Sequence, residues 1–110
     1  MSYIPERGDI IWLNFDPSSG KEIIKRRPAF VISRKAFNQH TGLALVAPIS
    51  STIRGIKLEV VLNDTSKTHG AILVHQVKSF DFVEREAVFI ERVSQEIIDQ
   101  VKMVLKVITD

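Results

Sequence analysis

The hydrophobic pattern of this chain changes its period once, and that change limits the possible folds more than any other feature of the sequence. Over the first three-quarters of the chain, short apolar segments alternate with turn-forming residues. From Ser94 onward, apolar residues recur at helical spacing instead, at Ile97, Ile98, Val101, Val104, Leu105 and Ile108. Ser94 is a suitable N-cap. We therefore expect a mainly β chain that ends in one α-helix.

The apolar segments predict strands, and the polar segments between them predict loops. We expect a turn at 16–20, a mobile loop at 21–27, and a helical turn or irregular loop at 34–40. The second strand is expected to begin at Pro28, because proline cannot donate a hydrogen bond to a ladder. The predicted strands cover residues 9–15, 28–33, 43–49, 56–62, 71–80 (bent near Gln76) and 87–91. Short antiparallel strands of this number favour a small barrel, with the helix covering its open end or packing in a dimer.

Length and composition predict an ordinary globular protein with one domain over residues 1–110. The chain contains no cysteine, which excludes disulfides, thiol catalysis and thiolate metal sites. Its first residues lack the apolar stretch of a signal peptide, and no apolar run is long enough to span a bilayer. We therefore expect a cytoplasmic location.

The positive charges are clustered, although the formal net charge is only +2. Lys21, Lys25, Arg26 and Arg27 share one short segment. Smaller basic groups follow at Arg34 with Lys35 and at Arg54 with Lys57. Such a cluster is either a solvated surface or a phosphate-binding segment, and charge alone leaves both possibilities open.

The chain lacks the sequence patterns of most catalytic sites. His40, His69 and His75 show no metal-ligand spacing. No glycine-rich phosphate loop and no Gly-x-Ser-x-Gly elbow is present. We therefore expect no metal or cofactor, and chemistry that depends on charged side chains and hydroxyls. RNA suits such a site, because its own 2′-hydroxyl can attack the adjacent phosphorus, and an arginine fork matches phosphate oxygens.

Five segments, in order and at consistent spacing, resemble the MazF/PemK/Kid family of endoribonuclease toxins from bacterial toxin–antitoxin pairs. They are residues 7–12 (RGDIIW), 16–22 (DPSSGKE), 27–33 (RPAFVIS), 46–50 (VAPIS) and 74–79 (VHQVKS). The resemblance extends from about residue 5 to the end of the chain. It implies an SH3-like antiparallel β-barrel with a C-terminal α-helix, assembled as a homodimer. It also implies metal-independent, sequence-selective cleavage of single-stranded mRNA, and an acidic antitoxin that folds on binding.

The resemblance also assigns roles to individual residues. Arg27 and Ser50 would flank the scissile phosphate, and Glu22 would orient Arg27 or accept a proton. Because arginine holds its proton tightly, charge stabilisation is the role we expect for Arg27. The residues expected to contact RNA are Lys21, Lys25, Arg26, Ser51, His75, Gln76, Phe37 and Asn38.

The chain departs from the family in two places. Many members carry Glu-Gln-x-Gly-x-Arg-Pro where residues 22–28 read EIIKRRP. His75 stands where relatives often have Asp or Asn, and we hypothesise that it makes activity pH-dependent. The structural alternative for His75 is a partly buried histidine on an apolar strand. Trp12 is expected in the core, although an exposed aromatic ring could stack a base.

A non-enzymatic function on the same barrel is the alternative to a ribonuclease. The CcdB family of gyrase poisons has a similar fold and places its target contacts in a C-terminal Trp-Gly-Ile. Residues 107–110 of this chain read VITD, which does not fit. An RNA-binding domain that has lost catalysis is a third possibility. The Arg27 and Ser50 positions favour the ribonuclease.

Overall fold

The computed structural model describes residues 3–15, 26–63 and 65–110. The described part of the chain holds seven strands and two α-helices. The strands are β1 (Asp9–Asn14), β2 (Arg26–Val31), β3 (Leu43–Ser50), β4 (Glu59–Val61), β5 (Ala71–Leu73), β6 (Lys78–Asp81) and β7 (Val88–Arg92). The helices are α1 (Lys35–Thr41) and α2 (Gln95–Thr109), and a single 3-10 turn, η1, covers Val74–Gln76. The predicted fold class, mainly β with a C-terminal helix, is confirmed.

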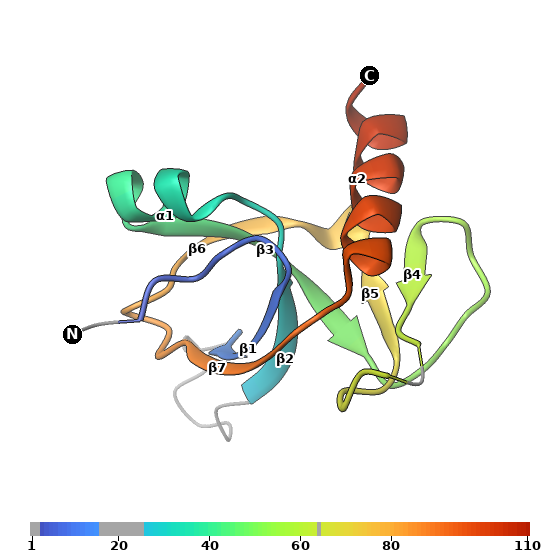
Figure 1. Cartoon of the computed structure of the whole chain (residues 1–110), viewed down its shortest axis with the longest axis horizontal. Helices are drawn as coiled ribbons and strands as arrows, with labels where there is room; N and C mark the ends of the chain where they lie inside the picture. The colour runs from blue at the N-terminus through green and yellow to red at the C-terminus, as the bar shows by residue number, and fades with distance from the viewer. Residues whose placement is uncertain (1–2, 16–25, 64) are drawn as a thin grey trace.

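The strands form one antiparallel sheet in the order β4-β5-β3-β2-β1-β7, with β6 also paired to β3. The sheet curls strongly (Figure 1). Strand β3 divides its partners: Leu43 to Val46 pair with β6, and Ile49 and Ser50 pair with β5. Among the described strands, β4 and β7 are not paired with each other. The fold is therefore barrel-like rather than a closed barrel.

Two hydrophobic cores lie on the two faces of the sheet. The core inside the curl contains Ile11, Leu13, Ala29, Val31, Ala44, Val46, Phe80 and Phe82. The other core joins the sheet to α2 through Ile10, Phe30, Ile72, Ile97, Ile98 and Val101, among others. Both faces of β2 are covered from Ala29 to Val31, and this half of the strand is continuously apolar, whereas Arg26 and Arg27 in its first half are exposed.

Helix α2 begins as predicted, with the backbone N–H of Ile97 donating to Ser94 Oγ at 3.4 Å. Its first half packs on the sheet, while its second half projects beyond the sheet (Figure 1). That second half exposes Met103, Val107 and Ile108. The helix therefore covers the sheet and also presents apolar side chains to solvent. Neither described helix is long and apolar enough to cross a membrane.

The start of β2 differs from the prediction. The strand begins at Arg26, and Pro28 lies inside it, paired with Trp12 of β1. Pairing of β2 with β3 begins only at Ala29. Pro28 therefore stands where β2 has a neighbour on one side only, and an edge position tolerates a missing N–H. Of the loop predicted at 21–27, residues 21–25 lie outside the described residues.

Of three other predictions, one was confirmed and two were not. The strand at 56–62 is only Glu59–Val61. The segment 71–80 bends near Gln76 as expected, because η1 separates β5 from β6. Trp12 is not in the core: its side chain is 41% exposed.

Candidate active site

A cavity of about 460 Å³ lies where the start of β2 meets the end of β3. The residues that line it come from β2, from β3 and the loop after it, and from the loop before β5: Arg27, Pro28, Ile49, Ser50, Ser51, Thr52, Arg54 and His69. We call it the Arg27 cavity. It combines two guanidinium groups, three hydroxyls and an imidazole, which is a suitable set for an anionic phosphate.

Strand pairing explains why residues so far apart in the sequence meet. Ser50, the last residue of β3, pairs with Ala71, the first residue of β5. This register brings His69 and Gly70 beside Ser50. Gly70 has φ +121°, and a Cβ there would lie 2.1 Å from the Ser50 carbonyl oxygen. Only glycine allows the two backbones to approach this closely.

The loop after β3 is held by a buried carboxylate. Glu59 is 8% exposed, and its Oε1 accepts the backbone N–H groups of Arg54 at 3.0 Å and Gly55 at 2.6 Å. Arg54 in turn donates from its guanidinium to the Thr52 carbonyl at 3.3 Å. Glu59 therefore positions the loop that carries Arg54 to the cavity.

The Ser50 hydroxyl is oriented by its own loop. Its oxygen accepts the backbone N–H of Thr52 at 3.1 Å. Because the oxygen is used as an acceptor, the hydroxyl proton can be donated to a ligand oxygen. Arg27 is exposed at the second position of β2. A fixed hydroxyl donor and an accessible guanidinium thus lie at the same cavity.

The structure brings together only some of the predicted site residues. Arg27, Ser50 and Ser51 line one cavity. Arg26 is exposed on β2 and donates to the Glu86 carbonyl at 3.1 Å. His75 and Gln76 are exposed on η1 and are not among the residues that line the Arg27 cavity. Glu22, Lys21 and Lys25 lie outside the described residues.

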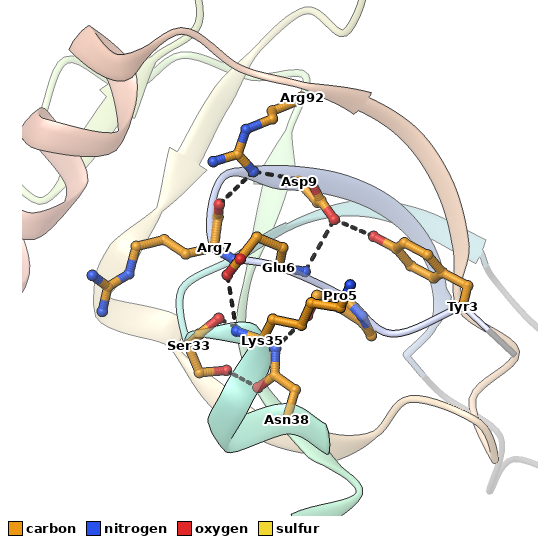
Figure 2. Close-up of polar contacts among 9 residues, drawn as sticks. All are labelled: Tyr3, Pro5, Glu6, Arg7, Asp9, Ser33, Lys35, Asn38 and Arg92. Carbon is orange, nitrogen blue, oxygen red and sulfur yellow. Dashed lines mark hydrogen bonds and ion pairs between the residues drawn. The ribbon is translucent and has the colours of Figure 1, made fainter. Parts of the chain in front are cut away.

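The predicted RNA contact at Asn38 is wrong. Asn38 is completely buried in α1. Its amide nitrogen donates to the carbonyls of Pro5 at 2.8 Å and Ser33 at 3.2 Å, and its oxygen accepts the Ser33 hydroxyl (Figure 2). Since all of these groups are internal, the side chain joins α1 to the N-terminal segment and is not accessible to RNA. Its neighbour Phe37 is 44% exposed but lines a different cavity.

Sequence reasoning missed three polar residues of the Arg27 cavity: Thr52, Arg54 and His69. Arg54 belonged to a basic pair that the charge pattern did reveal. His69 was considered only as a metal ligand. No sequence signal placed His69 beside Ser50, because that contact depends on the register between β3 and β5. In the described ranges, no three His, Cys, Asp or Glu side chains are grouped so that they could hold a metal ion.

The described chain closely matches solved toxin structures. It superposes on a crystal structure of MazE–MazF from Deinococcus radiodurans with a TM-score of 0.91, at 33% identity, over 97% of this chain and 96% of that one. An endoribonuclease in complex with its cognate antitoxin from a mycobacterial species shares the fold, with a TM-score of 0.79 at 16% identity. The fold is therefore that of small barrel-like toxins.

Sequence comparison identifies the family. The profile described as "PemK-like, MazF-like toxin of type II toxin-antitoxin system" matches residues 6–109. Endoribonuclease toxin MazF of Escherichia coli is 36% identical over 106 residues, covering 96% of this chain and 95% of the relative. Endoribonuclease toxin ChpB of the same organism is 37% identical over 110 residues, with 96% and 94% covered. The chain belongs to the PemK-like, MazF-like family of toxins from type II toxin–antitoxin systems.

Proposed function

We propose that this protein is an endoribonuclease toxin that cleaves single-stranded mRNA without a metal ion. The observation that carries the proposal is the single cavity that joins Arg27 and Ser50 to Arg54 and His69. The naming of several family members as endoribonucleases supports it and does not favour the gyrase-poison alternative.

The reaction needs little more than this cavity provides. The 2′-oxygen attacks the adjacent phosphorus and loses its proton, while the P–O5′ bond breaks and the 5′-oxygen gains a proton. The products are a 2′,3′-cyclic phosphate and a 5′-hydroxyl. Charge grows on the phosphoryl oxygens in the transition state, and Arg27 and Arg54 stabilise it while Ser50 donates a hydrogen bond. Holding the strand in line is the remaining requirement.

The two proton transfers need a different kind of group. Arginine is not deprotonated in proteins, so Arg27 acts through its charge. His69 is the imidazole that lines the cavity, and histidine is the side chain most often used for general acid–base catalysis. We assign one proton transfer to His69. Glu22, which lies outside the described residues, stays our proposal for orienting Arg27 or accepting the other proton.

The surface around the cavity suits a longer strand of RNA. Trp12 is exposed and pairs across the ladder with Pro28, which lines the cavity. An aromatic ring at this position can stack a base. We propose that the phosphate backbone of the RNA is bound by the basic residues that precede Arg27 in the sequence, Lys21, Lys25 and Arg26. Contacts farther from the cavity are proposed for His75, Gln76 and Phe37.

The family and the exposed apolar side chains also suggest partners. Met103 and Val107, exposed by 70% and 71% on α2, support assembly as a homodimer. An acidic antitoxin that folds on binding would cover the basic residues around the cavity. The crystal structure from Deinococcus radiodurans on which this chain superposes is one of MazE–MazF. We also propose a cytoplasmic location, because mRNA is available there.

Incubation of the purified, antitoxin-free protein with a long RNA in EDTA tests the function directly. We expect cuts at a short recurring sequence, with fragments ending in a 2′,3′-cyclic phosphate. Substitution of a 2′-deoxynucleotide 5′ of the cut should abolish cleavage at that position only. An absence of cleavage by the freshly purified protein, or cleavage that persists at the 2′-deoxy position, would contradict the proposal.

A further inference from the structure

A second cavity, of about 380 Å³, lies near the opposite end of β2, between the N-terminal segment, α1 and α2. Its lining contains five cationic side chains and one carboxylate: Arg7, Arg34, Lys35, Arg92 and Lys102, with Glu6, and also Ala36, Gln95 and Ile98. We call it the Arg7 cavity. Such a concentration of one sign of charge in a concave surface attracts anions.

Backbone carbonyls hold two of the guanidinium groups in place. Arg7 Nε donates to the Ile32 carbonyl at 2.7 Å. Arg92 donates from one terminal nitrogen to the Arg7 carbonyl at 2.7 Å and forms an ion pair with Asp9 at 3.3 Å. Figure 2 shows the Arg7 guanidinium pointing away from Asp9 and Tyr3. Side chains fixed before a ligand arrives lose less entropy on binding it.

The carboxylate in the Arg7 cavity is already used by the backbone. Glu6 Oε1 accepts the N–H groups of Arg7 at 2.9 Å and Lys35 at 2.8 Å (Figure 2). The N–H of Lys35 lowers the pKa of Glu6, so Glu6 stays ionised and keeps this structural role at neutral pH. Its charge offsets one of the five cations at most.

Most of the cations have no carboxylate partner. Within the described part of the chain, the ion pairs are Arg92 with Asp9 and Lys106 with Asp110. Asp9 is nearly buried, and its other oxygen accepts the Tyr3 hydroxyl and the Glu6 N–H. Burial raises the pKa of Tyr3, which therefore remains a neutral donor. The positive charge of the Arg7 cavity is thus left for an external anion.

We propose that the Arg7 cavity is a second phosphate-binding site, separate from the Arg27 cavity. Three arginines and two lysines surround a space large enough for a phosphate ester, and guanidinium forks can donate two hydrogen bonds to the oxygens of one phosphate. The phosphate can come from the backbone of a nucleic-acid strand or from a phosphorylated small molecule. The proposal stands on this cavity alone and does not require ribonuclease activity.

A titration with inorganic phosphate, followed by NMR, tests the site. Arg7 Nε–H is hydrogen-bonded inside the protein and provides a local signal. We expect phosphate, but not chloride at equal ionic strength, to shift the signals of Arg7 and Arg34. Lys102→Gln and Arg34→Gln change exposed side chains and should each weaken phosphate binding roughly ten- to a hundredfold, as for the loss of one charge-assisted hydrogen bond. Lys106→Gln, one turn along α2 and outside the cavity lining, is the matched control and should bind phosphate like the wild type.

Two further arms identify the source of the phosphate. A single-stranded DNA oligonucleotide lacks the 2′-hydroxyl and so binds without being cut. If it displaces phosphate and loses affinity in Lys102→Gln, the ligand is a strand; if a mononucleotide binds but the oligonucleotide does not, the ligand is a small molecule. The proposal is overturned if phosphate causes no shift at Arg7, if Lys102→Gln and Lys106→Gln bind phosphate equally, or if a polyglutamate peptide binds this cavity more tightly than either phosphate ligand.

Discussion

The two arginine-lined cavities of this chain lie toward opposite ends of β2 and hold their guanidinium groups differently. In the Arg7 cavity, Arg7 and Arg92 are bonded to backbone carbonyls at 2.7 Å, so the same side chains support the fold and face the cavity. In the Arg27 cavity, Arg54 donates to the Thr52 carbonyl of its own loop, but Arg27 is exposed, and Glu59 and Gly70, which do not line the cavity, support the backbone.

In the Arg27 cavity, the residues proposed for function differ from those that stabilise the fold. In the Arg7 cavity, the same arginines do both. Around Arg27, the residues proposed for chemistry can be changed with little loss of stability, because other residues hold the backbone. Around Arg7, removal of an arginine also removes a contact between the N-terminal segment and the end of β2. Substitutions in the two cavities should therefore divide differently between activity and free energy of unfolding.

The largest difference is expected between Arg27→Ala and Arg7→Ala. Loss of the Arg27 charge should lower the cleavage rate about a thousandfold, as for the loss of a donor that stabilises transition-state charge. Its free energy of unfolding should change by less than about 0.5 kcal/mol, since the side chain is exposed. Arg7→Ala should instead lower the free energy of unfolding by about 1 kcal/mol and lower the cleavage rate far less than Arg27→Ala does. The cleavage rate is measured in EDTA, and the free energy of unfolding is measured by urea denaturation. Equal effects of the two substitutions on the free energy of unfolding would contradict the difference between the two cavities.

Gly70→Ala tests whether the backbone at residue 70 has to lie so close to the Ser50 carbonyl. The added Cβ would lie 2.1 Å from the Ser50 carbonyl oxygen at φ +121°. Because backbone must shift, we expect a loss of about 3 kcal/mol or more in unfolding free energy, together with loss of cleavage. Gly42→Ala is the matched control: φ is +75° and nothing lies within 4 Å of the added Cβ. It should cost only about 1–2 kcal/mol, the strain of the left-handed conformation.

The histidines His69 and His75 provide the third test. His69→Asn should lower the cleavage rate about a hundredfold and flatten the pH profile between pH 5.5 and 8.5, because it removes the proposed proton-transfer group. His75→Asn should change the rate less than about twofold, since His75 is not among the residues that line the Arg27 cavity. If His75→Asn lowered the rate and flattened the pH profile while His69→Asn did not, the hypothesis from the sequence that His75 makes activity pH-dependent would be supported instead.

The sequence predicted the features that follow from local pattern. The change of hydrophobic period placed α2 and its cap at Ser94 correctly, and a bend near Gln76 was expected, where η1 lies. The resemblance to known toxins also paired Arg27 with Ser50, two residues that the structure brings to one cavity. These predictions depended only on residues close together in the chain or on the resemblance to a related sequence.

Predictions failed where a specific hydrogen-bond or strand partner, near or far in the sequence, decided the outcome. The strand expected at 56–62 begins only at Glu59, whose carboxylate is buried and accepts the N–H groups of Arg54 and Gly55. Asn38 was assigned to RNA, although the Pro5 carbonyl and Ser33 take its amide. Trp12 was expected in the core, but it is exposed at the end of the sheet where β2 has lost its β3 neighbour. None of these partners is visible in a local pattern.

The smallest predicted effect concerns Glu6, which should contribute stability to the Arg7 cavity in a pH-dependent way. The N–H of Lys35 lowers the pKa of Glu6 below its ordinary value of 4.5. The ionised carboxylate is therefore favoured in the folded state, so its contribution is fully present above pH 4.5 and is lost as pH falls through the folded-state pKa. Glu6→Gln should lower the free energy of unfolding by about 1 kcal/mol at pH 7, and the difference from wild type should shrink toward pH 3. Glu84→Gln removes the same charge from an exposed side chain and should show no such difference. A loss of stability in Glu6→Gln that is the same at pH 3 and pH 7 would contradict the assignment of this contribution to the ionised carboxylate.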